Sequence, residues 1–271
     1  MKNIIIFFSL IITSFNLLAQ KDDQEYLFDA MNKIEQNDLK AAVSDLNKAI
    51  ELNPNMFDGY VNRAILFDKL KKYKFAVNDF TSAIKIDSTQ YKLFMLRGVS
   101  QYKLRNFKLS IFDFTKAIEL KSDYYKAFYN RANSKKFLKD YEGSIIDYYK
   151  AIELNPLDIN SMINVGLILD EMKDYKGAID QFSKVIKIKP DYFKALNLRA
   201  ISKLNSRDFL GSINDNSKLI KINPNNPDPY ANRGKAKEFL EDLEGACEDW
   251  TTAASLGHGG AKRWILLQCN E

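Results

Sequence analysis

The stretch "YNRANSKKFLKDYEGSIIDYYKAIELNP", residues 129–156, recurs along the chain at a fixed distance. Residues 61–88 read "VNRAILFDKLKKYKFAVNDFTSAIKIDS", and residues 197–224 read "NLRAISKLNSRDFLGSINDNSKLIKINP". One column of small residues repeats every 34 positions without an insertion, at Ala42, Ala76, Ser110, Ser144, Ala178, Ser212 and Ala246. Seven copies at one period indicate a repeat architecture.

Each copy contains two segments with helical spacing. In the fourth copy, Ser144 is followed by Tyr148, Ala151 and Ile152, which places one apolar stripe on a helix. A short polar stretch precedes this segment, and Pro156 follows it, where proline cannot continue a helix. The pattern predicts an all-α chain in which every copy is a helix, a turn, a second helix and another turn.

The repeated pattern resembles the tetratricopeptide repeat, in which large, small, aromatic, alanine and proline residues stand at set places. The resemblance implies an α-solenoid of seven helix-turn-helix repeats, stacked into a right-handed superhelix with a concave groove. Asn216 takes the place of the large buried residue, so we expect the sixth copy to be the least stable. We place the copies at about residues 23–56, 57–90, 91–124, 125–158, 159–192, 193–226 and 227–258, followed by a C-terminal capping helix in 259–271.

The N-terminus has the layout of a secretory signal peptide. Lys2 precedes an apolar run from Ile4 to Leu18, and a small residue, Ala19, stands before a charged stretch. The run is shorter than the roughly 20 residues that a membrane-spanning helix needs. We therefore expect residues 1–19 to be cleaved near Ala19 and the mature chain to be periplasmic or extracellular. An uncleaved membrane anchor is the alternative.

Composition argues against nucleic-acid binding and against catalysis. The 271 residues carry a formal net charge of +5, and we expect basic and acidic residues to be interleaved along every segment rather than to form one basic cluster. The chain has one histidine, His258, at a turn where other copies carry proline, and an ordinary loop role is expected for it. No nucleophile and base pattern, glycine-rich phosphate loop or metal-ligand spacing occurs. We expect no enzyme activity, cofactor or metal.

Arginine and aspartate recur together, sixteen positions apart. Arg63, Arg97, Arg131, Arg199 and Arg233 are followed by Asp79, Asp113, Asp147, Asp215 and Asp249. The fifth copy lacks both, with Val165 and Gln181 instead, and this joint absence favours pairing within a copy. The first copy has Asp45 but no arginine. We expect exposed pairs that fix the register of the two helices and contribute about 0 to 1 kcal/mol.

The two cysteines lie near the C-terminus. If the tail folds back on the last helix, Cys269 comes opposite Cys247, and an exported protein is in a compartment where disulfides persist. We expect their α carbons to lie within about 7 Å of each other. A disulfide and a pair of buried thiols are both compatible with the sequence.

The resemblance also implies a binding surface on the first helix of each copy, on the face away from its partner helix. These positions either pack against the next copy or form a groove that receives an apolar peptide or helix. Leu27, Met31, Val61 and Ile65 replace the cationic and amide residues of the family's chaperone-type carboxylate clamp, so that clamp is not expected. The candidate groove residues are Leu27, Met31, Val61, Ile65, Lys92, Met95, Val99, Tyr102, Tyr129, Asn133, Ile163 and Leu167.

Together these patterns predict a non-catalytic scaffold that binds a peptide or helix of a partner protein in its concave groove. The alternative is a component of an envelope or outer-membrane-associated assembly that acts through oligomerisation. The sequence does not identify the partner.

Overall fold

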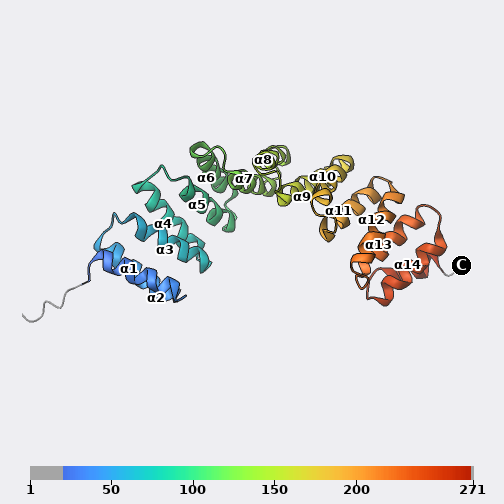
Figure 1. The fold of residues 1–271 in the computed structure, drawn as a ribbon, viewed down its shortest axis with the longest axis horizontal. Helices are drawn as coiled ribbons and strands as arrows, with labels where there is room; N and C mark the ends of the chain where they lie inside the picture. The colour runs from blue at the N-terminus through green and yellow to red at the C-terminus, as the bar shows by residue number, and fades with distance from the viewer. Residues whose placement is uncertain (1–20, 270–271) are drawn as a thin grey trace, which may run out of the picture. The chain divides into compact units, whose positions relative to one another are not determined.

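The computed structural model describes residues 21–269, which form fifteen α-helices and no strand (Figure 1). The first four helix pairs are α1 (Asp23–Glu35) and α2 (Leu39–Leu52), α3 (Phe57–Lys69) and α4 (Tyr73–Ile86), α5 (Tyr91–Lys103) and α6 (Phe107–Leu120), and α7 (Tyr125–Phe137) and α8 (Tyr141–Leu154). The others are α9 (Ile159–Glu171) and α10 (Tyr175–Ile188), α11 (Phe193–Asn205) and α12 (Phe209–Ile222), and α13 (Pro227–Glu238) and α14 (Leu243–Ser255), followed by α15 (Ala261–Gln268).

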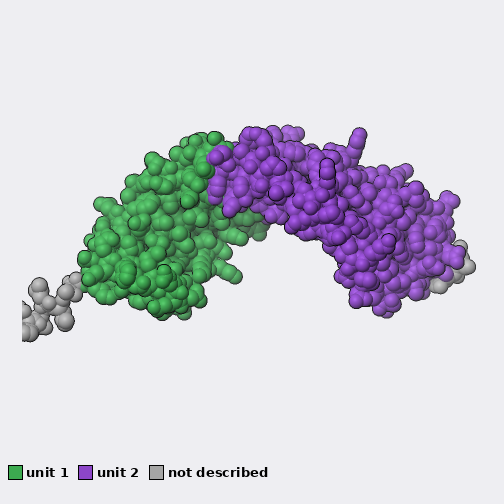
Figure 2. All heavy atoms as spheres, viewed as in Figure 1, with its two compact units in different colours: residues 1–122 green, residues 123–271 purple. Residues whose placement is uncertain are grey.

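Each helix pair lies within one of the seven predicted copies, and α15 lies within the predicted capping segment. The chain divides into two compact units, Met1–Ser122 with α1 to α6 and Asp123–Glu271 with α7 to α15 (Figure 2). The predicted signal peptide lies outside the described residues. Between residues 21 and 269, no helix is both long enough and apolar enough to cross a membrane. The chain is an all-α solenoid.

The turn inside every copy has the same backbone geometry. Its central residue adopts a left-handed conformation, with φ between 58° and 66°, although none of the seven is glycine. In the fourth copy, the N–H of Asp140 donates to the carbonyl of Lys135, and the N–H of Lys139 donates to Lys136. These two bonds satisfy carbonyls that the end of the first helix would otherwise leave unpaired. The turn therefore reverses the chain in the same way in all seven copies.

The small residues of the repeat allow the two helices of a copy to approach closely. A Cβ added to Gly166 would lie 2.5 Å from the ring of Phe182, and one added to Gly98 would lie 2.7 Å from Phe114. On the second helix, the hydroxyl of Ser144 donates to the carbonyl of Ala132 at 2.8 Å. The largest fully buried side chains include Phe80, Phe114, Tyr148, Phe182 and Trp250, one from each of five copies.

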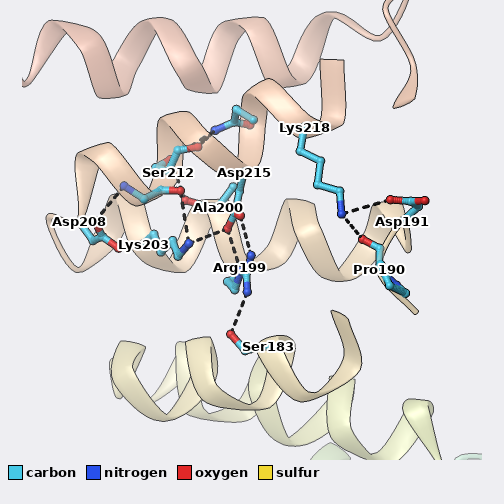
Figure 3. Close-up of polar contacts among 12 residues, drawn as sticks. Ser183, Pro190, Asp191, Arg199, Ala200, Lys203, Asp208, Ser212, Asp215 and Lys218 are labelled. Atoms are coloured by element: carbon cyan, nitrogen blue, oxygen red, sulfur yellow. Dashed lines mark hydrogen bonds and ion pairs between the residues drawn. The ribbon is translucent and has the colours of Figure 1, made fainter. Parts of the chain in front are cut away.

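The predicted pairs between arginine and aspartate form within single copies. In the sixth copy, Nε and Nη2 of Arg199 donate to the two carboxylate oxygens of Asp215 at 2.8 and 2.6 Å (Figure 3). Arg63, Arg97, Arg131 and Arg233 contact their own aspartates in the same way. The expectation of exposed pairs was wrong, because these aspartate side chains keep only 3–8% of their accessible surface.

The arginine also reaches the preceding copy. Nη1 of Arg199 donates to the Ser183 hydroxyl at 3.0 Å, and Nη1 of Arg63 donates to Oδ1 of Asn47 at 2.8 Å. Equivalent bonds join Arg97 to Thr81 and Arg233 to Ser217. One guanidinium thus holds both helices of its own copy and the second helix of the copy before it.

Two copies use different residues for the same connection. In the first copy, Lys33 pairs with Asp45, although no arginine is present. In the fifth copy, Val165 and Gln181 replace the ion pair, and Nε2 of Gln181 donates at 3.2 Å to the hydroxyl of Tyr149 in the preceding copy. Tyr149 takes the column that carries Asn47, Thr81 and Ser183 elsewhere. A tyrosine and an amide therefore keep the fifth copy joined to the fourth.

The C-terminal helix closes the last copy. Ala261, Trp264 and Ile265 of α15 pack against Trp250, and Nζ of Lys235 lies 4.3 Å from the centre of the Trp264 ring. A disulfide joins Cys247 to Cys269 with an α-carbon separation of 5.8 Å, inside the expected range. A crosslink of this loop length contributes about 3 kcal/mol in the chain-entropy model.

The ion pair between Arg63 and Asp79 can be tested by introducing valine and glutamine, the residues that the fifth copy has at these two columns. We expect Arg63→Val to lower the unfolding free energy by about 3 kcal/mol, because it leaves the buried Asp79 carboxylate unpaired. Adding Asp79→Gln should recover more than half of that loss. Urea unfolding of the single and double variants measures both effects.

A matched control is Lys48→Met, which breaks the exposed pair between Lys48 and Glu51 and should cost less than about 1 kcal/mol. If the losses of unfolding free energy from Arg63→Val and Asp79→Gln are additive in the double variant, the two side chains are not energetically coupled.

The sixth copy carries a polar defect in its core. Asn216 is fully buried, and its side-chain oxygen has no hydrogen-bond partner among residues 21–269. The facing residue is Ala200, and alanine at that column faces Leu46 in the first copy and Phe80 in the second. We expect Asn216→Leu to raise the unfolding free energy by about 1–2 kcal/mol, because it removes an unpaired carbonyl and adds apolar burial.

Thermal and urea unfolding check this prediction. Phe182→Asn places the same defect in the fifth copy and should lower stability by about 3 kcal/mol. An Asn216→Leu chain that is no more stable than the original would mean that the site has no room for the larger side chain.

Candidate functional site

The candidate groove residues on the first helices differ widely in exposure. Met31 of α1 and Ile65 of α3 are 41% and 43% exposed, and Lys92 of α5 is also exposed. The half-buried members of the set are Leu27, Val61, Val99, Tyr102, Tyr129, Asn133 and Leu167. The accessible part of the predicted groove is therefore narrower than the sequence pattern suggested.

Met95 and Ile163 are corrections to the predicted groove, since they are only 8% and 4% exposed. Their column faces the residue nineteen positions later on the second helix of the same copy. Ile163 packs in one cluster with Phe182, as Leu27 does with Leu46. These side chains contribute to packing within the copy and are not available to a ligand.

The predicted aromatic residues are tied to the interior. The ring of Tyr129 meets that of buried Tyr148 edge-on, with 5.8 Å between centroids, and the Tyr148 hydroxyl donates to Oδ1 of Asn133 at 2.7 Å. Nδ2 of Asn133 donates in turn to the carbonyl of Tyr129. Tyr102 lies edge-on against Phe107 at 5.6 Å. These contacts hold Tyr102, Tyr129 and Asn133 in fixed orientations, each with part of its surface accessible.

A hollow of about 400 Å³ opens beside this network in the unit that holds α7 to α15. Leu167 and Ile168 of α9 provide apolar lining, and Lys136 of α7 and Glu171 of α9 provide opposite charges. The remaining lining residues are Phe137, Lys139 and Tyr141. One predicted groove residue, Leu167, lies in this hollow.

Lys136 is the unusual group of the hollow. Its ammonium donates to Oδ1 of Asn164 at 3.1 Å, and no carboxylate lies within ion-pair distance of it in the described part of the chain. Burial lowers the pKa of Lys136, and nearby Lys194 lowers it further, while Glu171 opposes both effects. A half-buried ammonium with one neutral partner can donate a further hydrogen bond to an acceptor on a ligand.

The hollow also carries an acceptor. The Tyr141 hydroxyl donates to the Glu171 carboxylate, and this bond raises the pKa of Tyr141. Glu171 is thereby held at the rim, on the helix that also provides Leu167. The hollow thus combines an apolar side chain with an ammonium donor and a carboxylate acceptor.

Within residues 21–269, no group of histidine, cysteine, aspartate and glutamate residues could hold a metal ion. His258 caps the start of α15, because its Nδ1 accepts from the N–H of Ala261 at 3.1 Å, and its ring lies against Trp264. The histidine therefore has a structural role at the turn.

The sequence interpretation missed Lys136, Phe137, Tyr141 and Glu171. Lys136 follows Asn133 by three positions and so lies on the same helix face, which was the available signal. Lysine is ordinarily a solvated surface residue, and only the packing of α9 against this surface shows that it is half-buried.

The chain is similar to proteins of one family. A family model described as tetratricopeptide repeat matches residues 30–56, 125–156 and 159–192. No curated protein sequence matches significantly.

Among solved structures, a tetratricopeptide repeat protein from Parabacteroides merdae is 19% identical, with a TM-score of 0.63, and the match covers 92% of this chain and 99% of that one. The C-terminal part of a TPR repeat-containing protein from Cytophaga hutchinsonii is 19% identical, with a TM-score of 0.76 and coverage of 86% and 96%. YrrB, described as a TPR protein with an unusual peptide-binding site, is 17% identical, with a TM-score of 0.61 and coverage of 69% and 97%.

These structural likenesses show the fold. Together with the family model, the 34-residue period and the seven helix pairs, they show that the chain is built from repeats of the tetratricopeptide type.

Proposed function

We propose that the chain is a non-catalytic scaffold that binds a peptide segment of a partner protein along the first helices α7 and α9. Tetratricopeptide repeats generally bind protein or peptide partners, and the similar protein YrrB is described as having a peptide-binding site. The observation that carries the proposal is the half-buried Lys136 ammonium beside the partly exposed apolar side chain of Leu167.

The chemistry of the hollow specifies what a bound segment would provide. Lys136 retains donor capacity for a carbonyl or carboxylate oxygen, and Glu171 can accept from a peptide N–H. Leu167 favours an apolar side chain next to these polar groups. A segment with an acidic or carbonyl oxygen next to an apolar residue fits all three requirements.

Selection from a display library of random peptides on the mature chain tests this function. We expect enriched peptides to lose affinity by about tenfold or more with Lys136→Met, because a hydrogen bond to a charged group is lost. Leu167→Asp should weaken the same peptides. Lys150→Met on α8 is the control, since Lys150 pairs with Glu153 on an exposed helix face, and it should leave binding unchanged.

Stability separates a binding role from a structural one. Burial opposes the charged form of Lys136, so Lys136→Met should leave the unfolding free energy of the peptide-free chain unchanged or raise it. The pKa of Lys136 is lower in the folded chain than in the unfolded chain. The unfolding free energy of the wild-type chain should therefore rise relative to that of Lys136→Met as pH increases from the native pKa toward the ordinary value of 10.5. The absence of enriched peptides, or equal binding by Lys136→Met, would contradict the groove function.

We also propose that the chain is exported, with residues 1–19 removed. The disulfide between Cys247 and Cys269 supports this, because such bonds persist in oxidising compartments. N-terminal sequencing of the native protein should return a residue at or near Gln20. A soluble cytoplasmic chain that begins at Met1 would contradict export.

A further inference from the structure

The turns between the two helices of copies two and three form a cationic edge. All six of its cations are exposed, and none forms an ion pair with any residue between 21 and 269. We call this set the basic edge: Lys71, Lys72, Lys74, Lys103, Arg105 and Lys108. The acidic residues near this edge are Asp68, whose carboxylate accepts from the Ser100 hydroxyl, and Glu35 and Asp38 at the equivalent turn of copy one. The basic edge lies within the unit that holds α1 to α6.

The basic edge coincides with a change in helix capping. In copies one and four to seven, an aspartate such as Asp140 caps the second helix by accepting from an N–H three residues later. Lys72 and Asn106 replace it in copies two and three, where no side chain caps α4 or α6. The loss of an aspartate cap costs about 1 kcal/mol per helix and leaves the positive end of the helix dipole uncompensated.

A second column changes together with the cap. In copies four to seven a glycine follows the aspartate by three residues, and a Cβ there would lie 2.1–2.5 Å from the aspartate carboxylate. Copy one accommodates Ala41 at this column beside Asp38. Without the aspartate, copies two and three carry Phe75 and Leu109, which are 57% and 54% exposed. Leu104 and Phe112 add further exposed apolar surface on α6 and the turn before it.

The turn of copy seven has the opposite charge and the same apolar character. Its exposed acids are Glu241, Asp242, Glu244 and Glu248, which we call the acidic edge, and none forms an ion pair with another described residue. Phe239, Leu240 and Leu243 are exposed beside them, with Phe239 at 61%. Of the nearby cations, Lys237 is bound to Asp249, while Arg207 of copy six is exposed.

A hollow of about 870 Å³ borders the acidic edge. Its lining is mixed and consists of Leu243, Glu244, Glu248, two threonines, the disulfide-bonded cysteines, and Ile265 and Gln268 of α15. The acidic edge therefore borders a concave surface with apolar, hydroxyl and carboxylate groups, within the unit that holds α7 to α15. A convex partner with exposed aromatic and aliphatic side chains and cations matches this surface in both shape and charge.

We propose that the basic edge of one chain binds the acidic edge of a second copy of the same chain. Each edge combines exposed apolar side chains with unpaired charges of one sign, so their association buries apolar surface and pairs charge. Because one chain carries both edges, the contact is between two different surfaces and can continue from chain to chain. This goes beyond groove binding, since it uses the turns and not the first-helix face.

Charge reversal provides the test. Sedimentation velocity of the mature chain at low ionic strength should show self-association, which weakens as salt shortens the screening length to about 3 Å near 1 M. A triple variant with Lys71→Glu, Lys72→Glu and Lys74→Glu should abolish self-association. A double variant with Glu241→Lys and Glu244→Lys should abolish it as well. A mixture of the two reversed chains should associate again, because each then supplies the charge that the other lacks.

Two further variants distinguish a loss of association from a loss of folding. Lys173→Glu with Lys176→Glu reverses cations at the same turn of copy five and should leave association unchanged. Lys72→Asp with Phe75→Gly, together with Asn106→Asp and Leu109→Gly, gives copies two and three the capped turn of copies four to seven. This chain should keep or raise its unfolding midpoint, because two helices regain their caps, while its self-association dissociation constant rises about tenfold or more.

The proposal is overturned if the wild-type chain is monomeric at every concentration and salt tested, or if the mixed reversed chains fail to associate. It is also overturned if the monomeric wild-type chain floats with phosphatidylglycerol vesicles and the Lys71, Lys72 and Lys74 reversal does not. In that case the basic edge faces an anionic lipid surface. These outcomes do not depend on peptide binding at Lys136.

Discussion

In five of the seven copies, the bond network of one arginine fixes how the copy is built and joined to the copy before it. The guanidinium is planar and carries five donors, so it can bind both oxygens of an aspartate on the second helix and a third acceptor in the preceding copy. Arg199 does this with Asp215 and Ser183. A buried ion pair of this kind adds little net stability compared with apolar packing. Its effect is geometric, because three directed bonds define the rotation and the height of one helix relative to two others.

The fifth copy shows that this geometry can be met by different chemistry. Val165 removes the guanidinium, Gln181 removes the charge that would otherwise be buried without a partner, and Tyr149 extends across the space to Gln181. Three columns change together because any single change would leave a buried polar group unpaired. The small residues also match their partners, since the Phe182 ring lies where a Cβ on Gly166 would be, at 2.5 Å.

The period, the helix pairs and the pairing of arginine with aspartate could be predicted from the sequence, because every copy repeats the same evidence and the fifth copy loses both partners at once. The burial of Met95 and Ile163 could not. Their column lies at the border between the partner helix and the outer face, and a 3.6-residue period resolves the direction of a side chain only to within a broad stripe. The partial burial of Lys136 depends on which helix of the next copy lies over it, which a single copy's pattern does not contain.

In a repeat protein, a residue that departs from the pattern in one copy can be compared with the residues at the same column in the other copies. Equivalent columns have nearly the same surroundings, so a residue that costs stability in one copy can be compared with the residue that avoids the cost in the others. Asp140 and Gly143 show what the turn uses when only helix capping matters, and Lys72 and Phe75 give up that cap while exposing an aromatic ring. The overall charge of +5 hides the separation of cations in copies two and three from the acids of copy seven. Folding of a single chain gains nothing from uncapped helices, exposed rings and unpaired charges together. A surface with these three properties is stabilised only when another molecule covers it.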